Sequence, residues 1–392
     1  MNRSGARGSF GSGLAVGIIA GLALAAAIVF LLGGFEGEDD PVAQAKEVIQ
    51  DNYFEEVPTE RLEQSSIRGM VDQLRKTYDD RFSHYFSPEQ LHTFEQGTSG
   101  RFDGIGLAVN EVPRGLRVAL VYPDTPAEKA GITEGEVIVS VDGKSIEGEP
   151  ADVSTGMIKG PPGTDVVLEI FSPKTRKTRT ITVERASVRI PAVQGRMIKS
   201  DEGRFAWVQF ATFSEGSHGE LRDEVERLYR RGAEGLVLDL RGNGGGLLNE
   251  AVLAASIFVE DGTIVSTRSR TQGDRKYKAV GDAIEPRPTV VLVNKDSASA
   301  SEILAAALQT YDIADVVGTR TFGKGTFQEV ISLPAGGAVD LTIGQYLTAN
   351  GTSIAGKGVN PDVRAEDDPA TKGKDEALQR ALAVVGDLAA EQ

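Results

Sequence analysis

The second half of the chain alternates short apolar runs with longer amphipathic stretches. Residues 205–210, 236–240 and 289–293 are apolar and rich in β-branched side chains, which is typical of buried strands. Residues 217–231 and 302–309 instead have the composition and spacing of helices. A strand, a helix and a second strand in this order form a βαβ unit. We therefore predict a mixed α/β core for this half.

The N-terminal end predicts a membrane anchor. Residues 13–34 contain no charge and are long enough to cross a bilayer as a helix. Arg3 and Arg7 precede this stretch and four acidic residues follow it, so the positive-inside rule leaves residues 1–12 in the cytoplasm. The alternative is a cleaved signal peptide, but residues 30–35 offer no clear small-x-small cleavage site. We expect a single-pass protein of the cell membrane whose remaining residues are extracytoplasmic.

Three further regions flank the core. Residues 35–97 show apolar side chains at helical spacing and predict a linker with helices. Residues 98–187 are richer in strand signals, including the turn pair Asp142-Gly143 after an apolar run. Residues 366–392 predict a polar linker and an amphipathic helix that packs back onto the core.

Composition narrows the classes of function. The chain has 392 residues and is 40% apolar, which suggests two or three packed domains. Its formal net charge of −15 argues against nucleic acid as a partner, because phosphate binding requires a basic face. A basic cluster at residues 268–278 is expected to be a solvated loop, with a substrate rim as the alternative. The absence of cysteine excludes disulfides and thiol catalysis.

Residues 296–328 carry the candidate chemistry. They open with Asp-Ser-Ala-Ser-Ala-Ser-Glu-Ile, which lies at the turn between a predicted strand and a predicted helix. The first amides of a helix lack intrahelical partners and can stabilise negative charge beside such a serine. Because the chain has no cysteine and three histidines, Lys324 is the remaining candidate base, and its glycine and phenylalanine neighbours could desolvate the amine and lower its pKa. If residues 324–328 form a strand, Gln328 shares a face with Lys324 and can orient the amine.

Other interpretations of these residues stay open at this point. Ser299 and Glu302 fit a capping box at the start of an ordinary helix, with Lys324 on a simple glycine turn. Spacing alone does not show that the serine and the lysine meet. His218 is another candidate base, but it lies in a second predicted capping box, residues 217–220, and the sequence identifies no carboxylate to orient it.

The serine run, followed by Val-Val-Gly and then by Thr-Phe-Gly-Lys-Gly-Thr-x-Gln, resembles the C-terminal processing (tail-specific) peptidases. The resemblance covers about nine-tenths of the chain, which makes chance agreement of short motifs implausible. It implies that Ser299 is the nucleophile, Lys324 its general base and Gln328 the residue that positions the lysine.

A glycine-rich loop, Arg-Gly-Asn-Gly-Gly-Gly, follows the apolar run 236–240. No Lys-Ser/Thr pair follows it, so it does not predict a phosphate-binding P-loop. In the resembled family this loop supplies half of the oxyanion hole, which implies that the amide of Gly245, or of Gly246, lies opposite that of Ala300. This chain departs from the commoner family sequence, because Gly242 and Gly244 stand where that sequence has asparagine and proline.

Residues 98–187 resemble a PDZ domain, with Phe-Asp-Gly-Ile-Gly-Leu-Ala-Val near their start. The resemblance implies that backbone amides hold the terminal carboxylate of a peptide while the following strand pairs with that peptide. The residues that supply this loop are Gly104, Ile105, Gly106 and Leu107. The alternative is a plain β-rich module.

These observations predict an α/β (α+β) multidomain protein. The resemblance implies a serine endopeptidase with a Ser/Lys dyad, which cleaves extracytoplasmic proteins recognised through accessible C-terminal tails and uses no metal or cofactor. Two alternatives are a catalytically inactive, PDZ-containing binding scaffold of the same fold and a peptidase that cuts internal loops of unfolded proteins. The predicted order is a cytoplasmic tail (1–12), a transmembrane helix (13–34), a helical region (35–97), a PDZ domain (98–187), a mixed α/β serine peptidase core (188–365) and a linker with a C-terminal helix (366–392).

Overall fold

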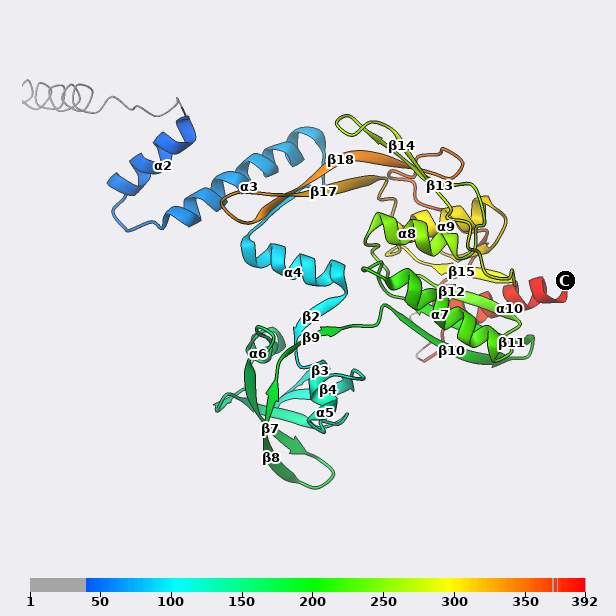
Figure 1. The fold of residues 1–392 in the computed structure, drawn as a ribbon, viewed down its shortest axis with the longest axis horizontal. Helices are drawn as coiled ribbons and strands as arrows, with labels where there is room; N and C mark the ends of the chain where they lie inside the picture. Colours follow the sequence, from blue (N-terminus) through cyan, green and yellow to red (C-terminus); the bar gives the residue numbers. More distant parts are fainter. Residues whose placement is uncertain (1–39, 369, 372, 392) are drawn as a thin grey trace, which may run out of the picture. The chain divides into compact units, whose positions relative to one another are not determined.

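The computed structural model describes residues 40–368, 370–371 and 373–391. The chain divides into two compact units, Met1–Gln73 and Leu74–Gln392, and the division falls within helix α3 (Thr59–Tyr78) (Figure 1). The predicted tail and transmembrane stretch, residues 1–34, lie outside the described residues. Among the residues that are described, no helix is long and apolar enough to cross a membrane.

The first unit is helical where it is described, as predicted. Helix α2 (Pro41–Asn52) begins after Asp40, whose carboxylate accepts the N–H of Val42 at 2.9 Å. Proline at the first position of the helix costs no hydrogen bond, because that N–H has no intrahelical partner. Lys46 on α2 pairs with Glu63 on α3 at 2.6 Å. Polar contacts therefore join α2 to the first turns of α3.

The core of the second unit is a six-stranded sheet in the order β10-β11-β12-β15-β16-β19. β10 is antiparallel to β11, and the other neighbours are parallel. The three predicted strands are present as β11, β12 and β15, so the mixed α/β prediction is confirmed. The strands are β10 (Val193–Ser200), β11 (Gly203–Phe210), β12 (Gly235–Asp239), β15 (Thr289–Val293), β16 (Asp315–Gly318) and β19 (Val363–Arg364).

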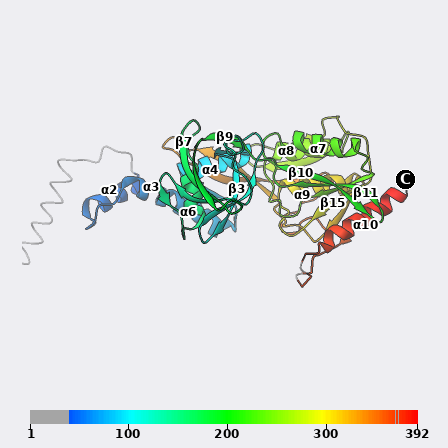
Figure 2. The ribbon, with the colours of Figure 1, turned by 90° about the horizontal axis from the view of Figure 1, so that it is seen from below.

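Alternate residues of the central strands face two separate hydrophobic cores, because successive side chains of a strand point to opposite faces. Leu236 and Leu238 of β12 join the core on the side of α7, α8 and α9, whereas Val237 joins the core on the side of α10. Figure 2 shows α7 and α8 on one side of the strands and α10 on the other. Helices on both faces account for strands that are apolar throughout. The helices are α7 (Ser217–Arg230), α8 (Leu248–Ser256), α9 (Ala300–Thr310) and α10 (Glu376–Ala390).

Helix α7 does not begin with the predicted capping box. Its N-cap is Gly216, which has a φ of +76°. The hydroxyl of Ser217 donates to Glu250 at 3.2 Å, and Glu220 accepts the N–H of Ala192 at 2.7 Å. The predicted box is therefore wrong, because tertiary contacts use both of its side chains.

A second sheet has the order β1-β18-β13-β14, and β17 also pairs with β18. Thr267 of β13 lies opposite Tyr346 of β18, which fixes the position of this tyrosine. Residues 268–278 belong to the hairpin of β13 and β14, so the prediction of a loop holds only for residues 270–274 and is wrong for the strand residues on either side. The basic residues fit a strand because β14 lies at an edge of the sheet, where charged side chains reach solvent. The strands are β1 (His84–Phe86), β13 (Thr263–Ser269), β14 (Arg275–Lys278), β17 (Thr326–Ser332) and β18 (Ala338–Thr348).

Residues 98–187 contain a separate sheet in the order β3-β4-β5-β7-β8, which has its own hydrophobic core. Strand β3 lies at the edge of this sheet. The predicted turn at Asp142-Gly143 connects β5 to β6, and both residues have positive φ, +48° and +76°. A two-stranded sheet of β2 (Arg101–Gly104) and β9 (Ala186–Arg189) precedes and follows this module. The elements of the module are β3 (Leu107–Val112), β4 (Gly115–Val121), α5 (Pro126–Lys129), β5 (Val137–Val141), β6 (Lys144–Ser145), α6 (Ala151–Ile158), β7 (Asp165–Ser172) and β8 (Lys177–Glu184). Helix α4 (Pro88–Ser99) comes before β2.

Candidate active site

The loops that follow the parallel strands β12, β15 and β16 meet at the carboxyl ends of these strands. Open α/β sheets usually bind their ligands at this edge. Here the loops contribute to a cavity of about 790 Å³, together with residues of β17 and β18. The predicted catalytic and oxyanion residues all line it, namely Ser299, Lys324, Gln328, Gly245 and Ala300.

Hydrogen bonds distinguish the three serines of the run. The hydroxyl of Ser297 donates to the carbonyl of Leu240 at 2.8 Å, and that of Ser301 donates to the carbonyl of Asn243 at 2.9 Å. Ser297 and Ser301 are both fully buried. Ser299 lines the cavity instead, and its φ of +58° lies in the left-handed region that residues with a Cβ rarely adopt. Backbone strain of this kind clusters at functional sites.

The buried carboxylate of Glu302 joins the serine loop to the lysine loop. Its Oε2 accepts the N–H of Ser299 and the N–H of Lys324, both at 2.9 Å. Its Oε1 accepts the hydroxyl of Thr321 at 2.6 Å and the N–H of Gly323 at 2.7 Å. Glu302 therefore caps α9, as the simpler interpretation expected, but it also fixes the lysine loop relative to the serine.

The amine of Lys324 lies in a partly apolar part of the cavity. Nζ is 5.0 Å from the centre of the Phe82 ring, a cation–π distance. Burial lowers the pKa of Lys324 below its ordinary value, although the negative charges of Asp340 and Glu302 oppose this shift. Among the hydrogen bonds and ion pairs of the described residues, none joins Nζ to Ser299. The lysine and the serine therefore line one cavity without a hydrogen bond between them among the described residues.

Tyr346 donates a hydrogen bond from its hydroxyl to Oγ of Ser299 at 2.8 Å. The tyrosine is 2% exposed, and its ring stacks on that of Phe327 with the centroids 6.4 Å apart. Burial raises the pKa of Tyr346 well above its ordinary value, so the phenol keeps its proton. Sequence reasoning missed this contact, because the two residues are 47 positions apart, one at the N-cap of α9 and the other in β18.

Gln328 lines the cavity, but the strand expected to include both it and Lys324 does not include the lysine. Strand β17 begins at Thr326, so Lys324 is outside it, and the register shifts between Phe327 and Gln328. The prediction that Lys324 and Gln328 share one face of a strand is therefore wrong. The amide Nε2 of Gln328 donates to the hydroxyls of Thr326 and Thr342 at 3.3 and 3.1 Å.

The glycine-rich loop packs directly against the serine. A Cβ added to Gly245 would lie 2.8 Å from Cβ of Ser299 and 2.9 Å from the amide nitrogen of Ala300, so the position requires glycine. The N–H of Gly245 donates to the side chain of Asn243 at 2.9 Å. In the part of the chain that the structure describes, the amides of Ala300 and Gly246 have no acceptor. These two amides are therefore available to donate to an oxyanion, and Gly245 forms the contact between the loops.

Comparison with known proteins agrees with this geometry. Residues 204–365 match peptidase family S41, and residues 117–170 match the PDZ domain. The chain is 34% identical over 328 residues to the carboxy-terminal processing protease CtpA of Bacillus subtilis, which is 83% of this chain and 69% of that protein. The chain belongs to peptidase family S41.

Further members of the family show the same relationship. The chain is 34% identical over 360 residues to the carboxy-terminal-processing protease of Bartonella bacilliformis, which is 89% of this chain and 81% of that protein. The solved structure of a photosystem II D1 C-terminal processing protease is 31% identical with a TM-score of 0.51, and the match covers 89% of this chain and 97% of that one. The resemblance found in the sequence is confirmed. The chain is a serine-type C-terminal processing peptidase that carries a PDZ domain.

His218 has a carboxylate partner that the sequence did not reveal. Its Nδ1 lies 2.8 Å from Oε2 of Glu250, and its backbone N–H donates to the same oxygen at 2.9 Å. Neither residue lines the cavity that contains Ser299. The pair holds the start of α7 against α8, so His218 is poorly placed to act as the base of this peptidase.

The predicted carboxylate-binding loop of the PDZ domain, residues 104–107, connects β2 to β3. Gly106 has a φ of +88°, and a Cβ there would lie 2.3 Å from Cβ of Thr125. The loop therefore runs close to the start of α5, and Ile105 within the loop is buried at 2% exposure. Since β3 is an edge strand, one side of it is available to a peptide added as a further strand.

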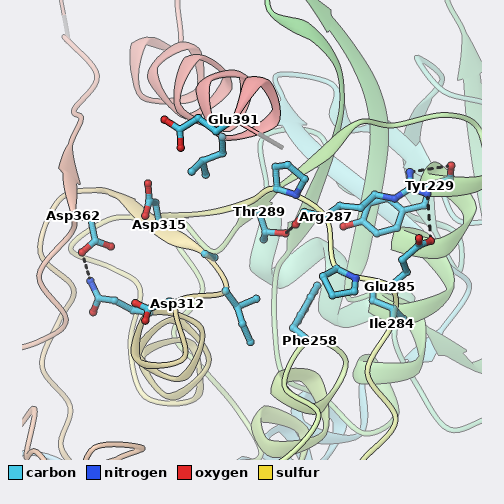
Figure 3. Close-up of a pocket in the computed structure, with 16 residues that line it drawn as sticks. Tyr229, Phe258, Ile284, Glu285, Arg287, Thr289, Asp312, Asp315, Asp362 and Glu391 are labelled. Carbon is cyan, nitrogen blue, oxygen red and sulfur yellow. Dashed lines mark hydrogen bonds and ion pairs between the residues drawn. The ribbon is translucent and has the colours of Figure 1, made fainter.

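A second cavity, of about 510 Å³, lies at the opposite, amino edge of the core sheet. Figure 3 shows Thr289 and Asp315, the first residues of β15 and β16, on its wall. Burial and the nearby charges of Asp362 and Glu391 raise the pKa of Asp315. No group of histidine, cysteine, aspartate and glutamate residues within the described ranges is arranged to hold a metal ion.

Proposed function

We propose that the peptidase cleaves its substrates with a Ser299/Lys324 dyad. The observation that carries this proposal is the position of Glu302, whose Oε2 accepts the backbone N–H groups of both residues at 2.9 Å. This link holds the two loops at one cavity, in which the strained Ser299 faces the open space. The lowered pKa of Lys324 suits a base, since a lysine accepts a proton only when it is neutral.

The proposed reaction proceeds through an acyl-enzyme. Oγ of Ser299 bonds to the carbonyl carbon of the scissile peptide while its proton passes to Nζ of Lys324, and the carbonyl electron pair moves to the oxygen beside the amides of Ala300 and Gly246. The C–N bond then breaks, and Lys324 returns the proton to the leaving amine. Water hydrolyses the ester in the same way, giving its proton to Lys324, which returns it to Oγ. In this proposal Gln328, which lines the same cavity, orients the amine through its amide oxygen, since its Nε2 already donates to Thr326 and Thr342.

The proposed substrates are proteins whose C-terminal tails bind to the PDZ domain. Two features support this. The edge strand β3 leaves one side free for a peptide strand, and residues 104–107 form a loop next to it that offers backbone amides to a terminal carboxylate. Main-chain pairing provides affinity with little dependence on sequence, so the pockets beside β3 would set the preference for particular tails.

The proposed place of action is outside the cytoplasm at the cell membrane. Support comes from the uncharged stretch 13–34, with arginines before it and acidic residues after it. Full-length protein should stay in membranes after high-salt and carbonate washing, and protease added from outside should digest residues beyond 35. Recovery of a soluble form that begins near Phe35 would show cleavage and contradict the anchor.

A fluorophosphonate probe tests the nucleophile in the full-length protein. The probe should label Ser299, as identified by mass spectrometry of the modified peptide, and Ser299→Ala should lose both the label and cleavage of an unfolded protein. Circular dichroism should show that the variant stays folded, because loss of one hydroxyl at a helix start costs about 0.5 to 2 kcal/mol. Tail binding without label or cleavage in the unmodified protein would favour the inactive scaffold instead.

A further inference from the structure

The contact between Tyr346 and Ser299 involves Oγ, the atom that forms the new bond to the substrate in the proposed reaction. A serine hydroxyl has one proton and two lone pairs. Tyr346 already donates to one lone pair at 2.8 Å, so Ser299 cannot donate its own proton to the tyrosine at the same time. The proton of Ser299 therefore remains free for another acceptor.

Burial decides which of the two groups near the serine can take that proton. It raises the pKa of Tyr346 and lowers the pKa of Lys324, so the phenol remains a donor while a larger fraction of the amine is neutral and able to accept a proton. Opposite shifts in neighbouring titratable groups often separate the donor from the base in an active site.

The position of Tyr346 is fixed by several contacts other than the one to the serine. Its N–H donates to the carbonyl of Gly325, the residue after the base, at 3.1 Å. Its Cα is paired with Thr267 in the register of β13 and β18, and its ring stacks on Phe327. The hydroxyl is thus aimed at Oγ by the sheet and by the lysine loop together, so it is preorganised before a substrate binds.

We propose that Tyr346 is a donor to the reacting oxygen, which stabilises Oγ of Ser299 as it gains negative charge. The inference rests on the proposed role of Ser299 as the nucleophile. As the serine proton moves to Lys324, the hydrogen bond from Tyr346 becomes charge-assisted and stronger, whereas in the ground state it joins two neutral groups. The same bond assists the reverse step, when Oγ leaves the acyl-enzyme and regains its proton from Lys324. Tyr346 keeps its proton throughout.

The test compares Tyr346→Phe with Tyr311→Phe in the full-length protein. Tyr311 is the matched control, because its hydroxyl donates to the carbonyl of Thr263 at 3.0 Å and it does not line the cavity. Loss of the Tyr346 hydroxyl should reduce the rate of fluorophosphonate labelling and kcat by about tenfold or more, with KM and the midpoint of the pH profile unchanged. Tyr311→Phe should label at the rate of the unmodified protein.

If Tyr346→Phe is labelled as fast as the unmodified protein, or faster, the proposal is overturned. The hydrogen bond from Tyr346 would then have no effect on the reaction or would slow it. If Tyr346→Phe does not fold, difluorotyrosine at position 346 keeps the ring and lowers the pKa of the phenol. That protein should lose labelling at high pH as the phenolate forms, and an unchanged pH profile would count against the donor role. An unmodified protein that is not labelled at Ser299 would refute the nucleophile itself, which separates the two failures.

Discussion

The carboxylate of Glu302 accepts the backbone N–H of Lys324 at 2.9 Å, so the first turn of the serine's helix holds the loop of the proposed base. Glu302→Gln replaces one carboxylate oxygen by an NH₂ group that faces donors. We expect kcat to fall by roughly a hundredfold, because small misplacements of reacting groups cost that much. We also expect the free energy of unfolding to fall by about 1 to 3 kcal/mol for each buried donor that loses its acceptor. Cleavage assays and denaturant unfolding measure these two effects.

Glu260→Gln is the control for this substitution. Glu260 is exposed and accepts the N–H of Ala283 at 3.1 Å, away from the cavity. Its replacement should leave kcat unchanged and alter the free energy of unfolding by less than about 0.5 kcal/mol. Full activity in folded Glu302→Gln would show that the link between the two loops is not needed for catalysis.

Tail recognition should depend on the free carboxylate of the peptide. Peptides with an apolar C-terminus should bind full-length Ser299→Ala, which cannot cleave them, and amidated copies should bind more weakly. Each lost charge-assisted hydrogen bond to the loop at residues 104–107 is worth roughly 1.5 to 3 kcal/mol. Calorimetry on the paired peptides measures the difference. Equal affinities would remove the support for carboxylate recognition by this loop.

Arg241 joins the start of the glycine-rich loop to the C-terminal helix. Its guanidinium donates to buried Asp239 at 2.7 Å and to Asp375, the N-cap of α10, at 2.8 Å. Arg241→Ala leaves the Asp239 charge without its cation, so we expect the free energy of unfolding to fall by about 3 to 5 kcal/mol. Exposed Arg364, which faces Glu366 at 3.5 Å, is the control, and Arg364→Ala should have little effect.

The pH dependence gives a second measure of the same contact. Burial tends to raise the pKa of Asp375, but the hydrogen bonds from Arg241 and from the N–H of Leu378, together with the charge of Arg241, hold the pKa below its ordinary value. A lowered carboxyl pKa contributes stability at neutral pH, and that contribution is lost as the pH falls through the lowered value. In Arg241→Ala the carboxyl of Asp375 should therefore titrate at a higher pH, as followed by NMR. An unchanged titration would contradict the pairing.

The sequence predicted most of the core because local pattern and burial agree there. The apolar runs became β11, β12 and β15, and the serine run lies at the strand-to-helix turn that its flanking residues indicated. The hairpin over residues 268–278 was missed, because charge density alone does not separate an exposed edge strand from a loop. The start of α7 was misplaced because Ser217 and Glu220 bond to distant residues instead of to their own helix.

Two contacts that sequence reasoning missed join distant parts of the chain. The hydrogen bond from Tyr346 to Ser299 depends on the pairing of β13 with β18, and the pairing of Glu250 with His218 depends on how α7 meets α8. Spacing along the chain carries no information about either contact. The same limit applies to Gln328, whose relation to Lys324 was inferred from a strand that begins two residues after the lysine.

The pH dependence of cleavage should identify the proposed base. Lys324 accepts a proton only when neutral, so kcat/KM should rise with pH and level off above its pKa, which burial lowers below the ordinary value for lysine. Lys324→Arg keeps the charge but does not deprotonate in a protein, so it should be inactive at every pH at which the protein is folded. Lys295→Arg, at an exposed position, should match the unmodified profile. Cleavage of an unfolded protein across a pH series measures all three, and substantial activity in folded Lys324→Arg would refute the assignment of Lys324 as the base.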